Sequence, residues 1–267
     1  MRPPRQEHAA LTHTIDRRAA VAGLALLSLC PPARAATPEQ LSIDADEGPV
    51  ALTRYAAEQA GKRASVLVLH GSHGFELKPR AYERYADALS AKGIDAYLLR
   101  YLTTADAPVF DPKTSTREKR EAYEATRFDF WAKRVSTVVT AILARPDSSG
   151  RLGLLGFSLG GYVAAATAAR DERVAALGVL YGGMPDAMVS EVKHLPPLIE
   201  LHGAADRNVS PAKGAELVKL GKAIGADAEF VVYPGKEHGF DFSDTDPMTA
   251  DAIDHVVRFF ESRLNVG

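Results

Sequence analysis

Residues 156–160 read Gly-Phe-Ser-Leu-Gly, and this G-x-S-x-G pattern is typical of a serine that acts as a nucleophile. An apolar run, residues 151–155, precedes the pattern, and a segment rich in small residues, 161–169, follows it. A strand, a tight turn carrying Ser158 and then a helix is the local structure that such a serine requires. The stretch therefore predicts a nucleophilic serine, with an incidental serine in a Gly-rich turn as the alternative.

A nucleophilic serine needs a base, and the base needs a carboxylate that orients it. Asp206 follows an apolar segment, residues 197–202, and lies 48 residues after Ser158. His238 follows another apolar segment, residues 228–233, and lies 32 residues after Asp206. Both side chains thus come just after predicted strands, at the edge where open parallel sheets place their ligands. We predict that Ser158, Asp206 and His238 form a catalytic triad, in which activity rises with pH as the imidazole loses its proton.

Other ionisable residues near these positions have less support. Asp241 and Asp244 are competing acids, but they follow His238 in the sequence and no predicted strand positions them. His202 ends a predicted strand, and we expect it to be a structural residue that supports the loop of Asp206. Asp206 itself also fits a turn or the start of a helix.

An acyl-transfer site also needs two N–H donors for the developing oxyanion. The first is expected to be the backbone N–H of Leu159, directly after the nucleophile. The second is expected from the loop at residues 71–75, after a predicted strand at 64–70. Within that loop we assign the donor to the backbone of Ser72 or His73, with His73 preferred.

The pair His70 and His73 does not predict a metal site. Its spacing is not that of a helical i, i+4 pair, and no cysteine or acidic cluster surrounds it in the sequence. We therefore expect no metal ion.

Four segments together resemble the dienelactone hydrolase family of α/β-hydrolases. They are residues 68–74, 156–161, 202–206 and 238–240, and their order and separations fit across nearly all of residues 48–264. The resemblance implies an α/β-hydrolase fold and hydrolysis of a small ester or lactone by a nucleophile–His–Asp triad through an acyl-enzyme. It also implies that no metal or organic cofactor takes part.

The sequence departs from the founding members of this family in two ways. Those enzymes use a cysteine nucleophile, whereas this chain has Ser158. They also carry a glutamate in the first loop, where residues 71–74 here read Gly-Ser-His-Gly and Glu76 does not match the pattern. These departures favour a more general serine esterase over an enzyme for dienelactone itself.

Two alternatives remain open at this stage. A hydrolase acting on acyl-peptide or polyester substrates would use the same residues. A non-catalytic exported binding protein could share the fold, although it has no need of an intact Ser158, Asp206 and His238 set. The natural substrate and the oligomeric state do not follow from the sequence.

The rest of the chain alternates short apolar runs and helical patterns, which predicts a mostly parallel sheet with helices on both faces. Strands are expected near residues 49–55, 64–70, 94–99, 151–156, 174–180, 197–202 and 228–233. Helices are expected near residues 79–92, 117–144, 159–170, 211–225 and 247–263.

The segment 102–130 is the least regular and follows a strand end, so it is a candidate cover for the substrate pocket. Tyr101 and Tyr181 each end a predicted strand, and Phe110 lies in the loop between. We predict that these three aromatic residues line the acyl or alcohol pocket.

The first residues carry the pattern of a secretory signal peptide. Arg17 and Arg18 precede an apolar run at 19–29, and Ala33-Arg34-Ala35 offers a cleavage site. The paired arginines suggest the twin-arginine route, with a Sec signal or a disordered arm as alternatives. We expect residues 1–35 to be removed, the protein to be exported to a bacterial periplasm or beyond, and residues 36–267 to form one domain.

Composition excludes several classes of protein. The 267 residues are 46% hydrophobic and 25% charged, with a formal net charge of −2, which gives no basic face for nucleic acid. The N-terminal apolar run is about half of the roughly 20 residues that span a bilayer, so we expect no membrane anchor. Cleavage would also remove Cys30, the only cysteine.

Overall fold

The computed structural model describes residue 1, residues 37–111, residue 113 and residues 115–264. The chain divides into two units, residues 1–34 and 35–267, and every element below belongs to the second. The predicted signal peptide, apart from Met1, lies outside the described residues. Export, the cleavage site and the start of the mature domain therefore stay predictions.

An eight-stranded sheet forms the centre of the fold, with strand order β1-β2-β4-β3-β5-β6-β7-β8. The strands are β1 (Glu39–Ile43), β2 (Val50–Tyr55), β3 (Arg63–Leu69), β4 (Ile94–Leu99), β5 (Ser148–Phe157), β6 (Val174–Leu180), β7 (Leu198–Gly203) and β8 (Ala228–Tyr233). Pairing from β4 through β8 is parallel, whereas β1 and β2 join antiparallel at one edge. The predicted mostly parallel sheet is confirmed.

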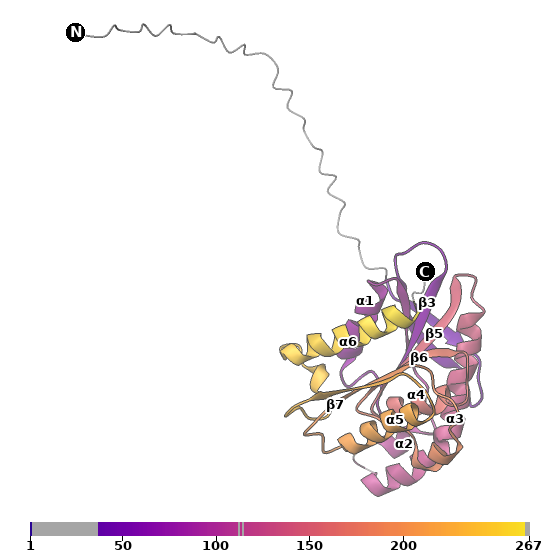
Figure 1. Cartoon of the computed structure of the whole chain (residues 1–267). Helices are drawn as coiled ribbons and strands as arrows, with labels where there is room; N and C mark the ends of the chain where they lie inside the picture. The colour runs from indigo at the N-terminus through magenta and orange to yellow at the C-terminus, as the bar shows by residue number, and fades with distance from the viewer. Residues whose placement is uncertain (2–36, 112, 114, 265–267) are drawn as a thin grey trace. The chain divides into compact units, whose positions relative to one another are not determined.

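Helices cover both faces of this sheet (Figure 1). They are α1 (Pro79–Ser90), α2 (Ala107–Phe110), α3 (Arg117–Leu143), α4 (Leu159–Ala168), α5 (Pro211–Ala223) and α6 (Pro247–Leu264). Helices α1 and α6 pack together against one face, and α3, α4 and α5 lie over the other. All six residues of β4 are buried, which is why the central strands read as continuous apolar runs. Within the described residues, none of the helices combines the length and apolar character that crossing a membrane requires.

Most differences from the sequence prediction lie at the edges of elements. Strand β1 was not predicted, because its sequence Glu-Gln-Leu-Ser-Ile has no apolar run and its residues are mostly exposed. The short helix α2 and two 3-10 turns, Asp186–Glu191 and Phe240–Phe242, were also not predicted. Strand β5 begins three residues before its predicted start. The other predicted strands and helices are present within about two residues of their bounds.

The strand order positions the predicted site residues. Strand β3 lies between β4 and β5, so the chain departs in opposite directions from β3 and β5, and a crevice forms outside their carboxyl ends. The loop at 70–74 follows β3 and Ser158 follows β5. Asp206 and His238 follow β7 and β8 at the same edge, which we call the carboxyl edge.

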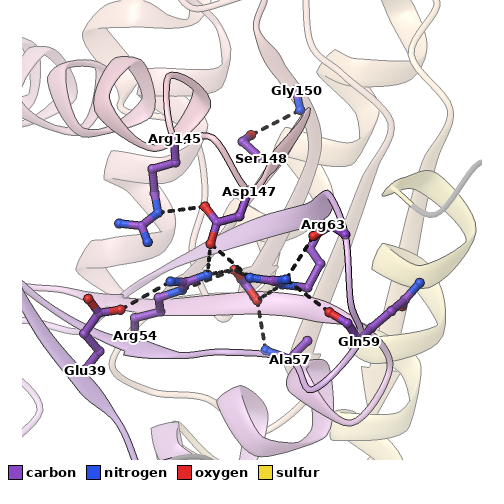
Figure 2. Close-up of polar contacts among 11 residues, drawn as sticks. Glu39, Arg54, Ala57, Gln59, Arg63, Arg145, Asp147, Ser148 and Gly150 are labelled. Atoms are coloured by element: carbon purple, nitrogen blue, oxygen red, sulfur yellow. Dashed lines mark hydrogen bonds and ion pairs between the residues drawn. The ribbon is translucent and has the colours of Figure 1, made fainter.

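At the opposite edge, six charged side chains form what we call the amino-edge network (Figure 2). Its members are Glu39, Arg54, Arg63, Asp95, Arg145 and Asp147. Asp95 lies at its centre and receives hydrogen bonds from Arg54 Nε at 3.2 Å, Arg63 Nε at 2.8 Å and the backbone N–H of Ala57 at 2.9 Å. The network thus joins β2, the beginnings of β3 and β4, and the turn before β5.

Burial makes this network different from ordinary surface ion pairs. Arg54 is 6% exposed and Asp95 2% exposed. Burial by itself would lower the pKa of Arg54, but hydrogen bonds to Asp95 and Asp147 and the nearby negative charge together outweigh it and raise the pKa. Burial would likewise raise the pKa of Asp147, but hydrogen bonds from Arg54 and Arg145 lower it to about 2. The buried charges of Arg54 and Asp95 therefore depend on each other, and removal of either leaves the other buried with fewer opposite charges.

Candidate active site

Ser158 lies at the sharp turn between β5 and α4, where its backbone is held at φ 54° and ψ −120°. A positive φ is uncommon for a residue with a side chain and marks local strain. The turn needs glycine on both sides: a Cβ on Gly156 would overlap the carbonyl of Gly160, and a Cβ on Gly160 would overlap that of Leu69. The Ser158 N–H donates to the Leu180 carbonyl at 2.9 Å, which fixes the turn to β6. The hydroxyl is left partly exposed at the carboxyl edge.

The structure brings together the three residues that the sequence singled out. His238 Nε2 lies 3.0 Å from Ser158 Oγ, and His238 Nδ1 lies 2.7 Å from Asp206 Oδ2. The His238 side chain is 19% exposed, whereas the Asp206 side chain is fully buried. This geometry allows the imidazole to accept the serine proton on Nε2 while it donates Nδ1–H to the carboxylate.

Asp206 is held by its own loop. Its Oδ1 accepts hydrogen bonds from the backbone N–H groups of Asn208 at 2.8 Å and Val209 at 3.0 Å. Burial alone would raise the pKa of this carboxyl, but hydrogen bonds from His202 and His238 outweigh burial and hold the pKa well below its usual range. The carboxyl is therefore ionised at neutral pH, with Oδ2 directed at His238.

The two competing acids are engaged elsewhere. Asp241 is fully buried, and its Oδ2 accepts a hydrogen bond from the Tyr85 hydroxyl at 2.9 Å. Burial raises its pKa to about 6, against the hydrogen bonds that lower it. Asp244 is exposed and pairs with Arg84. These placements agree with the choice of Asp206 as the partner of His238.

Leu159 is the first residue of α4, and its N–H therefore has no acceptor within the helix. The positive end of the helix dipole lies at the same point. An oxyanion beside Ser158 Oγ would meet both. The geometry is consistent with the predicted donor, whose role stays a prediction.

The loop after β3 passes directly beside the nucleophile. A Cβ on Gly71 would lie 3.5 Å from the Ser158 Cβ, and the Gly71 N–H donates to the Tyr82 hydroxyl at 3.3 Å. The next two residues are Ser72, which is partly exposed, and His73, which is exposed. Ser72 Oγ lies 3.2 Å from His73 Nδ1. Either backbone N–H thus stays a candidate for the second oxyanion donor.

His70 supports this loop from beneath. Its Nδ1 lies 2.7 Å from the Gly71 carbonyl oxygen, and its ring stacks on Tyr101 at 4.6 Å between centroids. Burial lowers the pKa of His70 to about 4, so the imidazole is neutral and donates Nδ1–H to the carbonyl.

Two of the three predicted pocket residues lie deeper than expected. Tyr101 and Tyr181 are 0% and 1% exposed, so neither presents its ring to solvent. The reason is that each ring turns inward at its strand end. The Tyr101 hydroxyl donates to the His70 carbonyl at 3.0 Å, and the Tyr181 ring packs 4.5 Å from the His238 ring. Both therefore act as supports beneath the candidate site.

Phe110 lines a cavity beside the candidate site, and its contact with an acyl or alcohol group stays a prediction. This cavity has a volume of about 290 Å³ and lies between the loop after β3 and the segment that contains α2. Its lining residues are Ser72, His73, Leu102, Thr103, Ala107, Phe110 and Asp111. Part of the 102–130 segment thus forms one wall beside the candidate oxyanion loop.

Asp106 holds that wall in place and was missed in the sequence. Its buried carboxylate accepts hydrogen bonds from the Tyr123 hydroxyl at 2.8 Å, Arg127 Nε at 3.1 Å and Trp131 Nε1 at 3.1 Å. It also accepts one from the Thr103 N–H at 2.6 Å. The aspartate lies in a polar loop and its partners lie on α3, so only the folded chain shows that they meet. Tyr82, on α1, was missed for the same reason.

Comparison with known proteins gives one family and one fold. The model of the dienelactone hydrolase family matches residues 52–263. A search of curated proteins finds no match to the chain.

Among solved structures, a dienelactone hydrolase from Anabaena variabilis superposes with a TM-score of 0.67 at 23% identity, covering 86% of this chain and 100% of that one. A lidless α/β serine hydrolase from Xanthomonas campestris superposes with a TM-score of 0.64 at 18% identity, covering 88% of this chain and 99% of that one. An acylaminoacyl peptidase from Pyrococcus horikoshii superposes with a TM-score of 0.67 at 12% identity, covering 88% of this chain but 43% of that one. At these identities the likeness establishes the α/β-hydrolase fold.

Proposed function

Because this chain belongs to the dienelactone hydrolase family and is therefore a hydrolase, we propose that it cleaves carboxylic ester or lactone bonds of small substrates. Ser158 is the proposed nucleophile, His238 the base and Asp206 the group that orients the base. The observation that carries the proposal is the pair of contacts of His238, at 3.0 Å to Ser158 Oγ and 2.7 Å to Asp206 Oδ2.

The first half of the reaction follows from this geometry. His238 Nε2 takes the proton of Ser158 Oγ as the oxygen attacks the carbonyl carbon. The carbonyl oxygen becomes an oxyanion, which the Leu159 N–H and a donor from Ser72 or His73 would stabilise. Asp206 stabilises the imidazolium that forms. His238 then protonates the leaving alkoxide, and an acyl-enzyme on Ser158 remains.

The second half repeats these steps with water. His238 takes a proton from the attacking water, the oxyanion forms again, and Ser158 regains its proton as the acid leaves. In a lactone the alcohol and the acid belong to one molecule, so the ring-opened hydroxy acid is released only at this stage. The chemistry needs only the side chains and backbone groups of this chain.

We place one group of the substrate in the cavity beside the loop after β3, because Ser72 and His73 of the candidate oxyanion loop line it. Its volume of about 290 Å³ is at the lower end of the range for small-molecule sites. Phe110 and Leu102 give it apolar walls, so it suits a short acyl or alcohol group. A small ester is therefore favoured over a polymer chain, and acyl-peptide and polyester substrates become outcomes of the test.

The test is hydrolysis of p-nitrophenyl acetate and butyrate by the purified protein and by Ser158→Ala. Loss of the nucleophile is expected to lower kcat/KM by about 10⁴-fold or more. Ser149→Ala is the matched control, because Ser149 is exposed at the other end of the same strand.

Each outcome separates the candidates. Turnover that only Ser158→Ala removes supports a serine esterase, and lactones, acyl-peptides and polyesters can then be ranked by kcat/KM. Equal turnover in Ser158→Ala and the parent protein would rule out Ser158 as the nucleophile. Absence of turnover on every ester, lactone and peptide of such a panel would leave the binding protein as the better description.

A further inference from the structure

Two ionisable side chains lie behind Asp206, and the proposed reaction does not use them. Glu200 and His202 both project from β7 on the side of Asp206 away from the solvent, and both side chains are fully buried. His202 Nδ1 lies 2.8 Å from Glu200 Oε1, and His202 Nε2 lies 3.4 Å from Asp206 Oδ2. A continuous row of polar groups thus runs from Glu200 through His202 and Asp206 to His238.

The partners of His202 determine its protons. Its Nε2 lies 3.1 Å from the Val209 carbonyl oxygen as well as close to the Asp206 carboxylate, and its Nδ1 faces the Glu200 carboxyl. All three neighbouring groups accept hydrogen bonds. A neutral imidazole supplies one N–H, so its other nitrogen would direct a lone pair at an acceptor. Two N–H groups satisfy every contact at once, and an ionised Glu200 balances the added charge.

The groups packed around Glu200 and His202 donate to one carboxyl oxygen of Glu200, Oε1, whereas Oε2 is buried and has no hydrogen-bond partner among the described residues. Glu200 Oε1 also receives the Gly182 N–H at 3.3 Å from the end of β6, and Gly214 of α5 packs so tightly that a Cβ there would contact the carboxyl group. The ring of Phe230, on β8, lies 6.5 Å from that of His202. Asp206 and Tyr162 of α4 also lie within electrostatic range of Glu200. No water-filled space is needed to satisfy the imidazolium.

The pKa directions agree with retention of the shared proton. Burial alone would lower the pKa of His202, but hydrogen bonds to Asp206 and Glu200 outweigh it and raise the pKa to about 9. Burial raises the pKa of Glu200 above its ordinary value. Because both pKa values are raised, the proton shared by Glu200 and His202 is retained near neutral pH.

We propose that His202 is a positioning residue, held as an imidazolium between Glu200 and Asp206, which fixes the Asp206 carboxylate for His238. Its Nε2–H contacts the same Oδ2 atom that receives the His238 Nδ1–H. It therefore prevents the carboxylate from rotating away, and its charge limits how strongly Asp206 stabilises the protonated form of His238. This inference rests on the proposed roles of Ser158, His238 and Asp206.

One test needs no variant of the site. Imidazole nitrogen NMR of the ¹⁵N-histidine-labelled protein is expected to show His202 with both nitrogens protonated from pH 5.5 to 8, without titration. The exposed His194 provides the comparison signal. A spectrum in which His202 carries one unprotonated nitrogen at pH 7 would overturn the imidazolium.

A second test measures the effect on the nucleophile. His202→Gln keeps a neutral donor near the Nε2 position but removes the charge, and His194→Gln is the matched control on an exposed loop before β7. The rate of covalent labelling by a fluorophosphonate and kcat/KM for p-nitrophenyl acetate are both expected to fall about 10- to 100-fold in His202→Gln. Most of the change should be in kcat.

The pH profile separates positioning from simple loss of structure. Without the positive charge beside Asp206, the protonated form of His238 is more stable, so the acid limb of kcat/KM is expected to move about 0.5 unit or more to higher pH. His194→Gln should leave the limb in place. A folded His202→Gln protein with an unchanged limb and labelling rate would overturn the positioning role.

The failure of this inference can be told from failure of the proposed function. Fluorophosphonate labelling depends on Ser158 and not on the choice of ester. If Ser158→Ala removes labelling while His202→Gln leaves it unchanged, the positioning role is wrong and the nucleophile stands. If Ser158→Ala labels as fast as the parent protein, the proposed nucleophile is wrong, and the NMR result still decides the state of His202.

Discussion

The two edges of the central sheet are built on opposite principles. At the amino edge, Arg54 and Asp147 are paired with each other, as Figure 2 shows, and Asp95 is paired with Arg54 and Arg63. At the carboxyl edge, Ser158 sits on strained backbone and His238 is partly exposed. One edge satisfies its polar groups, whereas the other holds polar groups ready for a substrate.

Substitutions at the two edges of the sheet are therefore expected to have different effects. Removal of a paired group at the amino edge leaves buried charges without partners, so it should lower stability. Removal of the Ser158 hydroxyl at the carboxyl edge should lower activity with little loss of stability, because that partly exposed hydroxyl is the group proposed to attack the substrate. The predictions below test this division, beginning with the largest effect.

Asp206→Asn should have the largest effect on activity. The asparagine carbonyl can still accept from the Asn208 and Val209 N–H groups, but its amide would donate toward His238 Nδ1. The imidazole would then carry its proton on Nε2 and could not accept one from Ser158. We expect kcat of the folded protein to fall about 10⁴-fold, measured with p-nitrophenyl acetate. A loss of less than about 10-fold would show that His238 does not depend on this carboxylate.

Asp95→Asn should give the converse result at the amino edge. The change leaves Arg54 buried with fewer opposite charges and removes one of the two acidic partners of Arg63, which keeps Asp147. The free energy of unfolding is expected to fall by about 3–5 kcal/mol in urea titrations, with kcat of the folded protein unchanged. Asp254→Asn, which removes an exposed pair with Arg258, is the control and should change stability by less than about 0.5 kcal/mol. Equal effects of the two variants would contradict the distinction between the edges.

Asp241 provides a test of how stability depends on pH, and its expected effect is smaller than those of Asp206→Asn and Asp95→Asn. Its pKa is raised from 3.8 to about 6 in the folded protein, because the carboxyl is buried. Its contribution to stability is therefore fully present below about pH 4 and is lost as the pH rises through about 6. Asp241→Asn is neutral throughout, so its stability relative to the parent should increase by about 3 kcal/mol from pH 4 to pH 7.5.

The measurement is urea unfolding at several pH values. Asp244→Asn is the control, because Asp244 is exposed and lies three residues further along the chain. If the Asp241→Asn and parent curves stay parallel across the range, burial of the Asp241 carboxyl does not affect the folding equilibrium.

The smallest effect concerns the strain at the nucleophile. Ser158→Gly and Ser158→Ala both remove the hydroxyl, but only glycine adopts a φ of 54° without strain. We expect Ser158→Gly to have a melting temperature higher than Ser158→Ala, equivalent to about 1 kcal/mol. A less stable glycine variant would mean that unfolded-chain entropy outweighs the strain.

Much of this architecture could be predicted from the sequence, because the central strands are apolar along their whole length. The runs at 64–70 and 151–156 indicated β3 and β5, and their ends located the loop at residue 71 and Ser158. Chain order and strand ends then identified Asp206 and His238. Local sequence was sufficient there because each residue directly follows a strand.

Other features depend on contacts between distant segments. Strand β1 has too few apolar residues to be recognised alone, and it forms by pairing with β2. Whether Tyr101 faces solvent or the interior depends on His70, which lies 31 residues earlier in the chain. Asp106 and Glu200 read as ordinary acids until the side chains around them are placed. Their environments come from packing, which local patterns do not contain.

The position of β8 has a consequence for how the protein would lose activity. This strand is the last in the sheet, and its outer side has no partner strand in the described chain. His238 follows it directly, whereas Ser158 follows the central strand β5. Edge strands open locally at lower free energy than the core. Heat inactivation should therefore begin with reversible fraying of the β8 edge, and turnover should disappear several degrees below the temperature at which the core melts.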